Sequence, residues 1–351
     1  MKTTTPFISR ATRTKLYQLP VLRTFSDYRN QSNVFVSLSN DPYFNLSYED
    51  WLFRQTDPSL PVLFMYRNKE SVIIGRNQNP WKEINQTALR QSNVEFVRRR
   101  SGGGTVYHDL GNTNYSVMIP RETFDRNTNA ELVAAALNSP EIGISASVNE
   151  RHDIIVGGKK IPYKIISKRA YHHGTMLINA QLDRLGDLLR NNKTSLHTKG
   201  VASVRSPVAN LASFSPNITH DAFVRAVTRA FQAKYYLHDQ TEGGVVYVEH
   251  GNETVEKGAN ELRSWDWRFG QTPEFTHDLS KTFPWGQISV HVASRKGLIT
   301  DCSVSGIDLP ANGLIGLRYG TLDGAEDVLT KTFTDQLNRL QNVLTWLRLE
   351  M

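Results

Sequence analysis

Short runs of β-branched and aromatic residues, separated by polar turns, begin at Val34 and predict a series of strands. The runs cover 34–39, 61–68, 71–79, 93–100, 105–120, 170–180 and 288–307. The last of them predicts a hairpin that turns at Lys296 and Gly297. Two further strands are predicted within 143–161, followed by a turn at Gly157 and Gly158.

Apolar residues that recur every three or four positions predict helices between these strands. The helical patterns cover 43–55, 129–138, 182–190, 219–236 and about 325–349. The pattern is clearest in 219–236, where Thr219 can cap the helix and Phe223, Val227 and Phe231 fall on one face. Strands and helices that mix without a regular β-α-β alternation favour the α+β class.

A length of 351 residues favours two domains, one large and one small. The stretch 238–260 is polar and rich in glycine, and the predicted boundary between the domains lies at its end. We therefore divide the chain into a leading segment (1–33), a large mixed-sheet domain (34–258) and a small α+β C-terminal domain (261–351).

Charge is concentrated at the N-terminus, because residues 1–33 carry +5 of the formal net charge of +7. We therefore expect no nucleic-acid partner, which would need basic side chains clustered on a folded domain. No run approaches the roughly 18 apolar residues that a membrane span needs, so we expect no membrane partner either. The single cysteine, Cys302, excludes a disulfide framework and a cysteine-based zinc site.

The leading segment is rich in Thr, Ser and Arg, has Asp27 as its one acidic residue, and lacks the apolar core of a secretory signal. This composition is typical of a mitochondrial transit peptide, and we expect a mitochondrial protein. The alternative is a basic disordered tail on a cytoplasmic protein.

The most distinctive motif is RRRSGGGTVYHD, residues 98–109, at the end of a predicted strand. Three consecutive glycines let the backbone take positive φ and approach a ligand closely, and the N–H groups of such a turn can bind an anion. The arginines add positive charge suited to a phosphate or an acyl phosphate. The spacing of a P-loop or a dinucleotide fingerprint is absent, so an ordinary glycine-rich turn is the alternative.

Two further segments could contact an anion. Arg76 lies in the polar loop 75–81 after a predicted strand, although most such loops bind nothing. Lys159 and Lys160 follow a pair of glycines, where a lysine could bridge two anionic groups. Adjacent His172 and His173 should point to opposite faces of a strand, so they are a poor metal pair, and we expect no metal held by protein side chains.

Six segments resemble, in order, the conserved blocks of lipoate–protein ligase A and the related mitochondrial lipoyltransferases. They are SNDPYFNLSYEDW, SVIIGRNQNPWKE, RRRSGGGTVYHDLGNTNYS, AYHHGTMLINAQLDRL, TKGVASVRSPVANL and SWDWRFGQTPEF. The last two resemble the two-domain ligase rather than single-domain octanoyltransferases or biotin ligases. The resemblance implies a biotin/lipoate ligase-like catalytic domain followed by a small C-terminal domain.

The resemblance also implies an enzyme that activates lipoate with ATP to lipoyl-AMP and transfers the lipoyl group to a lysine. ATP would enter with Mg²⁺, held mainly by phosphates and water. The acceptors would be lipoyl domains of 2-oxoacid dehydrogenase E2 subunits and the glycine cleavage H protein, and the enzyme would be a monomer. The acceptor supplies the nucleophile, which agrees with a chain that has no evident catalytic triad.

By position in the matching motifs, Lys160 would be the catalytic lysine and would contact lipoyl and phosphate oxygens. The resemblance places these further residues in the ATP and lipoyl-AMP site: Arg99, Gly104, Thr105, Val106 and Tyr107. Around them it places Arg76, Ser101, Gly102, Gly103, His108, Asp109, Asn112, Asp153 and His173.

Two positions depart from the family's pattern. Lys160 and Ile161 are followed directly by Pro162, so a segment that should shape the lipoyl site is about three residues short. His152 stands where the bacterial ligases tend to have Asn. Two alternatives therefore stay open: a lipoyltransferase that uses pre-formed lipoyl-AMP or a lipoylated donor protein, and a catalytically impaired binder of lipoyl domains.

Overall fold

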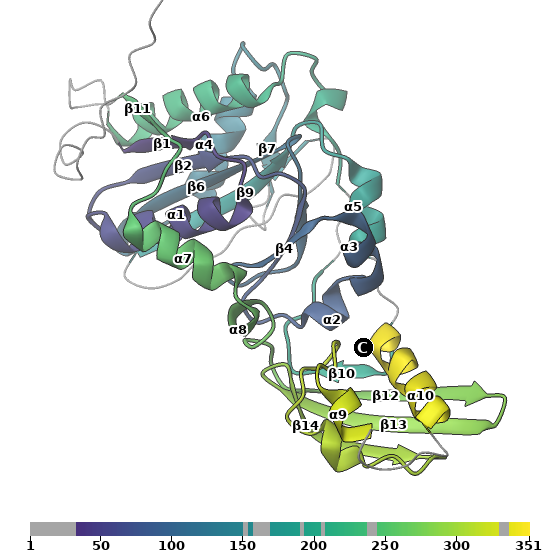
Figure 1. Ribbon diagram of the computed structural model, residues 1–351. Helices are drawn as coiled ribbons and strands as arrows, with labels where there is room; N and C mark the ends of the chain where they lie inside the picture. Colours follow the sequence, from purple (N-terminus) through teal and green to yellow (C-terminus); the bar gives the residue numbers. More distant parts are fainter. Residues whose placement is uncertain are drawn as a thin grey trace, which may run out of the picture.

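The computed structural model describes residues 33–149, 154–156, 169–189, 193–204, 208–236, 244–329 and 337–351. They form a larger unit, at the top of Figure 1, and a smaller unit below it. Residues 1–32 of the leading segment, the turn at Gly157 and Gly158, Asp153 and Lys160 lie outside the described residues, as do both departures from the family's pattern.

The larger unit is built on a mixed five-stranded sheet with the strand order β11-β1-β2-β6-β9. Its strands are β11 (Val245–Val248), β1 (Val34–Ser37), β2 (Val62–Tyr66), β6 (Asn112–Pro120) and β9 (Arg169–Leu177). β1 runs parallel to β11 and β2, whereas β6 runs antiparallel to β2 and β9. All but β11 confirm predicted strands.

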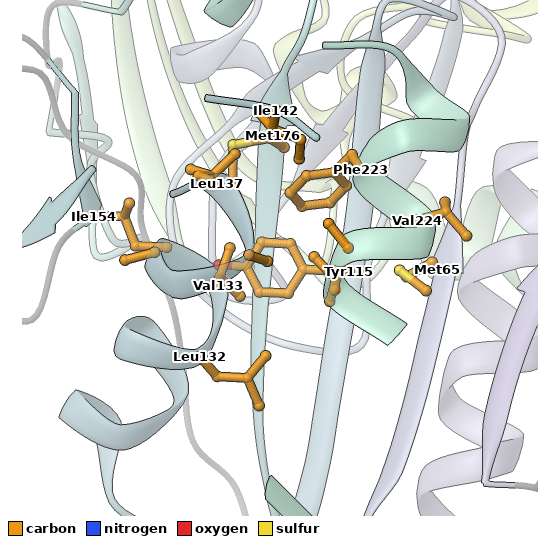
Figure 2. Packing of buried hydrophobic residues seen from close by; sticks show 14 of the residues in the cluster. Met65, Tyr115, Leu132, Val133, Leu137, Ile142, Ile154, Met176, Phe223 and Val224 are labelled. Carbon is orange, nitrogen blue, oxygen red and sulfur yellow. The ribbon is translucent and has the colours of Figure 1, made fainter. Parts of the chain in front are cut away.

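Helices α4 (Arg126–Leu137) and α6 (His220–Tyr235) cover one face of this sheet (Figure 1). α6 begins as predicted, because the side chain of Thr219 accepts a hydrogen bond from the N–H of Ala222. Figure 2 shows Tyr115 of β6 at the centre of the packing, with Val133 of α4 and Phe223 of α6 around it. Burial of these large apolar side chains stabilises this layer.

The other face is covered by α1 (Pro42–Gln55) and α7 (Glu253–Arg263), which pack on each other, and by a second sheet. In that sheet β3 (Ser71–Ile74) pairs parallel with β4 (Glu95–Arg98) and antiparallel with β5 (Val106–His108). Helices α3 (Gln86–Ser92) and α5 (Leu182–Leu189) pack on its far side. Two short strands, β7 (Ser147–Val148) and β8 (Ile154–Ile155), pair antiparallel, which confirms the two strands predicted within 143–161.

The smaller unit is an antiparallel sheet with the order β10-β12-β13-β14. Its strands are β10 (Leu196–Thr198), β12 (Phe275–Phe283), β13 (Gly286–Arg295) and β14 (Leu298–Ser305). The predicted turn at Lys296 and Gly297 is confirmed, and both residues have positive φ. The helical pattern of 325–349 corresponds to α9 (Ala325–Leu329) and α10 (Leu337–Glu350), with 330–336 outside the described residues.

The two units meet around α2 (Pro80–Glu83) and α8 (Trp265–Arg268) (Figure 1). Trp81 of α2 is 3% exposed, and its ring lies 5.3 to 5.4 Å from the rings of Phe269 and Phe275 and 4.9 Å from that of Tyr319. A side chain of the larger unit thus completes the core of the smaller one. The boundary predicted between 258 and 261 falls inside α7. No helix within the described ranges is long and apolar enough to cross a membrane.

Candidate functional site

The glycine motif forms the loop between β4 and β5, and it docks on the loop after β3. A Cβ atom at Gly75 would lie 2.1 Å from the carbonyl oxygen of Gly103, so this close approach requires a glycine. The N–H of Arg76 donates to the carbonyl of Ser101 at 2.8 Å. Gly103 has a φ of +98°, a conformation that side chains disfavour. The glycines are therefore needed to bring the two loops together.

Arg98 anchors the base of the glycine loop. Its fully buried guanidinium donates to the carbonyls of Arg76 and Gln78 at 2.8 and 2.7 Å. It also donates to the carbonyl of Arg268 and the hydroxyl of Thr272, each at 2.9 Å. Burial lowers the pKa of Arg98 to about 9, so the side chain is still charged at neutral pH. Arg98 thus ties the glycine loop to the junction of the two units.

Arg99 and Arg100 are also engaged within the protein. Arg99 donates to the carbonyls of Gly102 and Gly104 at 3.0 and 2.7 Å, and burial lowers its pKa. Arg100 forms an ion pair with Asp50 at 3.3 Å. The sequence suggested arginines that offer their charge to an anion, whereas the structure uses the three guanidinium groups to hold the loop in shape.

A network of side chains secures the C-terminal end of the loop. The Oγ of Ser203 accepts from the N–H of Thr105 and from Nε2 of Gln78, each at 2.9 Å, and donates to Glu83 at 2.5 Å. The Oε1 of Gln78 accepts from the N–H of Gly75 and the hydroxyl of Thr105, at 2.8 and 3.0 Å. These contacts connect the loop to α2 and to the segment after β10.

The face of the main sheet toward this loop carries polar side chains at alternate positions. Asn112, Asn114 and Ser116 follow one another along β6, and Ser116 pairs with His173 of β9. The Oδ1 of Asn112 and the Oγ of Ser116 are buried and have no hydrogen-bond partner within the described residues. Because such atoms lose their water without compensation, they are candidates for contacting a ligand.

His173 connects this face to α1. Its Nδ1 lies 3.4 Å from Oε1 of the buried Glu49. Burial, and next the charge of Glu49, raise the pKa of Tyr171 well above its usual value, so this phenol is neutral. The adjacent His172 instead packs on Tyr115 on the helix-covered face, with 5.8 Å between ring centroids. The prediction that the two histidines point to opposite faces is confirmed.

A small cavity opens between α1, β9 and the glycine loop, with a volume of about 20 Å³, which is room for a water molecule. Its lining combines apolar side chains with hydroxyl and charged groups, a mixture that suits a molecule with an apolar body and a polar end, but such a molecule would fit only if the lining side chains moved apart. The lining residues are Leu46, Glu49, Asp50, Phe53, Arg99, Arg100, Ser101 and Tyr171.

Two predicted residues of β5 and its following turn have structural surroundings. The side chain of Tyr107 lies on the far face of the small sheet, in a core with Leu188, and burial raises its pKa to about 12. The side chain of Tyr107 therefore points away from the site, and only its main chain lies on the side of the glycine loop. The carboxylate of Asp109 accepts from the N–H groups of Gly111 and Gln181, at 2.8 and 2.7 Å, and so fixes the turn before β6.

Most of the predicted residues that the structure describes gather around the cavity and the polar face. They are Arg99, Ser101, Gly102, Gly103, Gly104, Thr105, Val106, His108, Asn112 and His173. Arg76 is exposed at the edge of this region, 5.8 Å over the ring of Trp267. The described residues contain no group of three or more His, Cys, Asp or Glu that could hold a metal ion.

Several contributors were missed by the sequence reasoning. They are Glu49, Asn68, Glu83, Ser116 and Ser203. A signal existed for Ser116, because polar residues at every second position of an otherwise apolar strand mark one of its faces. The others lie in loops or helices far along the chain from the glycine motif, and folding brings them to it.

Comparisons with known proteins agree with this geometry. Residues 41–232 match the lipoyl protein ligase A/B catalytic domain family, and residues 272–310 match the bacterial lipoate protein ligase C-terminus. The lipoate-protein ligase A of Psychrobacter cryohalolentis is 36% identical over an alignment of 337 residues, and the alignment covers 91% of this chain and 98% of that protein.

Two solved structures share the fold over much of the chain. LipL1 of P. falciparum, in complex with lipoate, has a TM-score of 0.59 and 27% identity, over 90% of this chain and 98% of the other. A lipoate-protein ligase A bound with ATP has a TM-score of 0.53 and 25% identity, over 68% of this chain and 98% of the other.

The catalytic-domain family covers more than half of the chain, and the P. cryohalolentis relative matches over nearly its whole length. The α+β class, with its mixed sheets and small C-terminal domain, is confirmed. The resemblance found in six short segments is confirmed over the chain as a whole. This chain belongs to the lipoyl protein ligase A/B family.

Proposed function

We propose that this chain is an ATP-dependent lipoate–protein ligase, which activates lipoate to lipoyl-AMP and transfers the lipoyl group to a lysine of an acceptor protein. The supporting observation is the coincidence of two features in a member of this family. A glycine loop, fixed by buried arginines, lies beside a buried sheet face whose Asn112 and Ser116 leave polar atoms unpaired within the described residues.

The first step joins two anions. A carboxylate oxygen of lipoate attacks the α-phosphorus of ATP, an O–P bond forms, and the bond to the leaving pyrophosphate breaks. Catalysis of this step depends on holding the reactants in line and on neutralising their charge. ATP would enter as its Mg²⁺ complex, and the ion would neutralise part of that negative charge while being held by the phosphates and water rather than by side chains of this chain.

The glycine loop is suited to bind the phosphates. The carbonyls of Gly102 and Gly104 point at Arg99. Because a trans peptide holds its C=O and N–H in opposite directions, the N–H groups of Gly103 and Thr105 point away from that arginine. Gly103 is exposed, so its N–H is accessible to a phosphate oxygen.

We assign the acyl substrate to the cavity and the polar face. Leu46 and Phe53 offer apolar surface, while Ser101 and Tyr171 offer hydroxyl groups. Lys160, which lies outside the described residues, is proposed to bridge the carboxylate and the α-phosphate, on the strength of its motif position.

The second step needs no nucleophile from this chain. The neutral amine of the acceptor lysine attacks the carbonyl carbon of lipoyl-AMP, an amide bond forms, and the bond to AMP breaks. The amine proton leaves to solvent. We propose lipoyl domains of 2-oxoacid dehydrogenase E2 subunits and the glycine cleavage H protein as acceptors, and a monomer as the working form.

The test is the intact mass of a purified apo lipoyl domain after incubation with the chain. One reaction receives lipoate, ATP and Mg²⁺, and a parallel reaction receives lipoyl-AMP. We expect the mass of one lipoyl group to be added in both. If the mass increases only in the reaction with lipoyl-AMP, the chain is a lipoyltransferase and not a ligase. If it increases in neither reaction, the chain is a catalytically impaired binder of lipoyl domains.

A pair of lysine variants makes the test specific to the site. Lys160→Ala should abolish addition in the first reaction while its circular dichroism spectrum stays that of the wild type. Lys257→Ala is the matched control, because Lys257 lies exposed on α7 and pairs with Glu253 at 2.6 Å. It should keep full activity. Normal turnover by Lys160→Ala would refute the role assigned to this lysine.

A further inference from the structure

Two buried side-chain amides form a series of hydrogen bonds that ends at His108. It begins at Asn45, whose Nδ2 lies 2.9 Å from the carbonyl oxygen of Ser39 and 3.0 Å from that of Arg67. A backbone carbonyl can only accept a hydrogen bond. The atom of Asn45 that faces these two carbonyls must therefore be its nitrogen, and the orientation of this amide is fixed.

The orientation of Asn68 follows from that of Asn45. The same Nδ2 of Asn45 lies 2.9 Å from Asn68, and its two hydrogens are shared among the three acceptors. Because an amide nitrogen cannot accept a hydrogen bond, the atom of Asn68 that it meets is the oxygen, Oδ1. The other end of the Asn68 amide is then Nδ2, and it lies 3.0 Å from Nδ1 of His108. All three side chains are buried. Since Asn68 presents a donor, Nδ1 of His108 must accept, and a neutral ring carries its proton on Nε2.

The surroundings of His108 keep the ring neutral. Burial, with smaller contributions from the charges of Arg99 on the glycine loop and His173 on β9, lowers its pKa to about 3. The carboxylate of Glu49 on α1 lies 3.4 Å from Nδ1 of His173. Nε2 of His108 is buried and has no hydrogen-bond partner within the described residues. In the Nε2–H tautomer it is therefore a buried donor with no acceptor among the described residues, available to a bound molecule.

We infer that Asn45 and Asn68 are positioning residues that hold His108 as its Nε2–H tautomer, and that this N–H donates to an anionic oxygen of the bound substrates. The inference rests on the proposed function for the identity of those substrates, lipoate and ATP. A neutral imidazole donates this hydrogen bond without giving up its proton, so a carboxylate that it contacts stays anionic and nucleophilic. The two amides would thus act on the reaction only through His108.

The first test reads the tautomer directly. Long-range ¹H–¹⁵N spectra of the full chain, labelled with ¹⁵N in histidine and assigned with a His108→Gln variant, distinguish a protonated from an unprotonated ring nitrogen. We expect His108 to carry its proton on Nε2 alone between pH 6 and 8. A proton on Nδ1 would overturn the inference.

The same spectra identify the oxygen that is bound. We expect the Nε2 signal of His108 to shift when lipoate alone or MgATP alone is added. A shift with lipoate assigns the hydrogen bond to the carboxylate, and a shift with MgATP assigns it to a phosphate. No shift with either, or with both together, would refute the proposed donation.

The second test changes one atom of the chain. Asn68→Asp keeps the acceptor that faces Asn45 but replaces the donor that faces His108 by a second acceptor. The proton should then move to Nδ1, and Nε2 should keep its own proton only while the ring is cationic. We expect pyrophosphate release to fall roughly 10- to 100-fold at pH 8, as for a lost hydrogen bond to a charged group, and by less at pH 6.

Asn129→Asp is the matched control. Asn129 is a buried amide on α4, where it contacts the hydroxyl of Tyr235 and the carbonyl of Asp125. Its variant should keep the pH profile of the wild type. An equal loss for Asn68→Asp at every pH, with the tautomer unchanged, would reduce Asn68 to a structural residue. A wild type with the Nε2–H tautomer but no lipoylation would contradict the proposed function alone.

Discussion

Both faces of the main sheet pack against apolar clusters, but the face toward the glycine loop also carries a row of buried polar side chains on β6. Along β6, Tyr115 and Val117 face α4 and α6 and join a large apolar cluster. Their neighbours Asn114 and Ser116 face the glycine loop, where buried polar atoms meet a cavity. Successive side chains of a strand point to opposite faces. In β6, one set of residues therefore packs in the core, and the alternate set is available to bind a ligand.

The difference has an energetic meaning. Each buried polar atom without a partner costs on the order of 1–3 kcal/mol of folding free energy, whereas each large apolar side chain contributes about as much in the opposite sense. The helix-covered face thus offsets the cost of the site face. Substitutions on the helix-covered face should then lower stability and leave activity unchanged. Substitutions on the site face should lower activity and leave stability nearly unchanged.

The largest effect should come from the helix-covered face. Phe223 is completely buried and its ring lies 6.2 Å from that of Tyr115. Phe223→Ala should lower the free energy of unfolding by about 3–5 kcal/mol, since it removes apolar contacts and leaves a cavity. The activity per folded molecule should stay that of the wild type. Urea unfolding followed by circular dichroism measures the first quantity, and a loss below about 1 kcal/mol would contradict the assigned core.

A smaller loss of stability, with a larger loss of activity, is expected at the loop. In Gly75→Ala the new Cβ would lie 2.1 Å from the carbonyl oxygen of Gly103, so the glycine loop has to move. We expect a cost of about 1–3 kcal/mol in stability, as for other overpacked sites. We also expect roughly 100-fold lower pyrophosphate release, because reacting groups displaced by about 1 Å lose their alignment.

Gly186→Ala is the control for that substitution. Gly186 lies within α5 and has open space where its Cβ would be. An alanine inside a helix should raise stability by about 0.5–1 kcal/mol and leave the rate unchanged. If both variants released pyrophosphate at the rate of the wild type, the docking of the glycine loop on Gly75 would have no catalytic role.

Local patterns were enough to predict most strands and helices, and they failed where an element has few apolar residues. α6 was predicted with its cap, because a long apolar face recurs in the sequence. α7 was not, because only Val255, Ala259 and Leu262 are buried among its eleven residues. Its polar remainder is typical of a linker, and only packing on α1 reveals a helix that belongs to the larger unit.

The residues of the site likewise divide into those that the sequence predicted and those that it did not. Residues that neighbour one another in the glycine motif could be predicted from one segment. Glu49, Asn68 and Ser203 could not, because they come from three distant segments that meet only in the fold. The direction of a guanidinium is likewise set by tertiary contacts, so the sequence could not show that Arg98 and Arg99 donate to backbone carbonyls instead of facing an anion.

The smallest change in stability should come from one hydroxyl removed on each face. Ser116 on the site face and Thr228 on α6 each bury a hydroxyl that has no hydrogen-bond partner within the described residues. Ser116→Ala and Thr228→Val remove these oxygens. Because each variant removes an uncompensated buried polar atom and breaks no hydrogen bond of the described structure, both should be at least as stable as the wild type, with a gain of about 1 kcal/mol, at the low end of the cost of such an atom.

Activity should distinguish the two variants. If Ser116 contacts the bound acyl substrate, Ser116→Ala should raise the KM for lipoate by roughly 10-fold, the value of a typical hydrogen bond. Thr228→Val should leave both kcat and KM unchanged, because its hydroxyl lies on the helix-covered side. Equal kinetics for the two variants would mean that an unpaired hydroxyl on the site face has no more to do with the substrate than one in the core. The assignment of the acyl group to that face would then have to be abandoned.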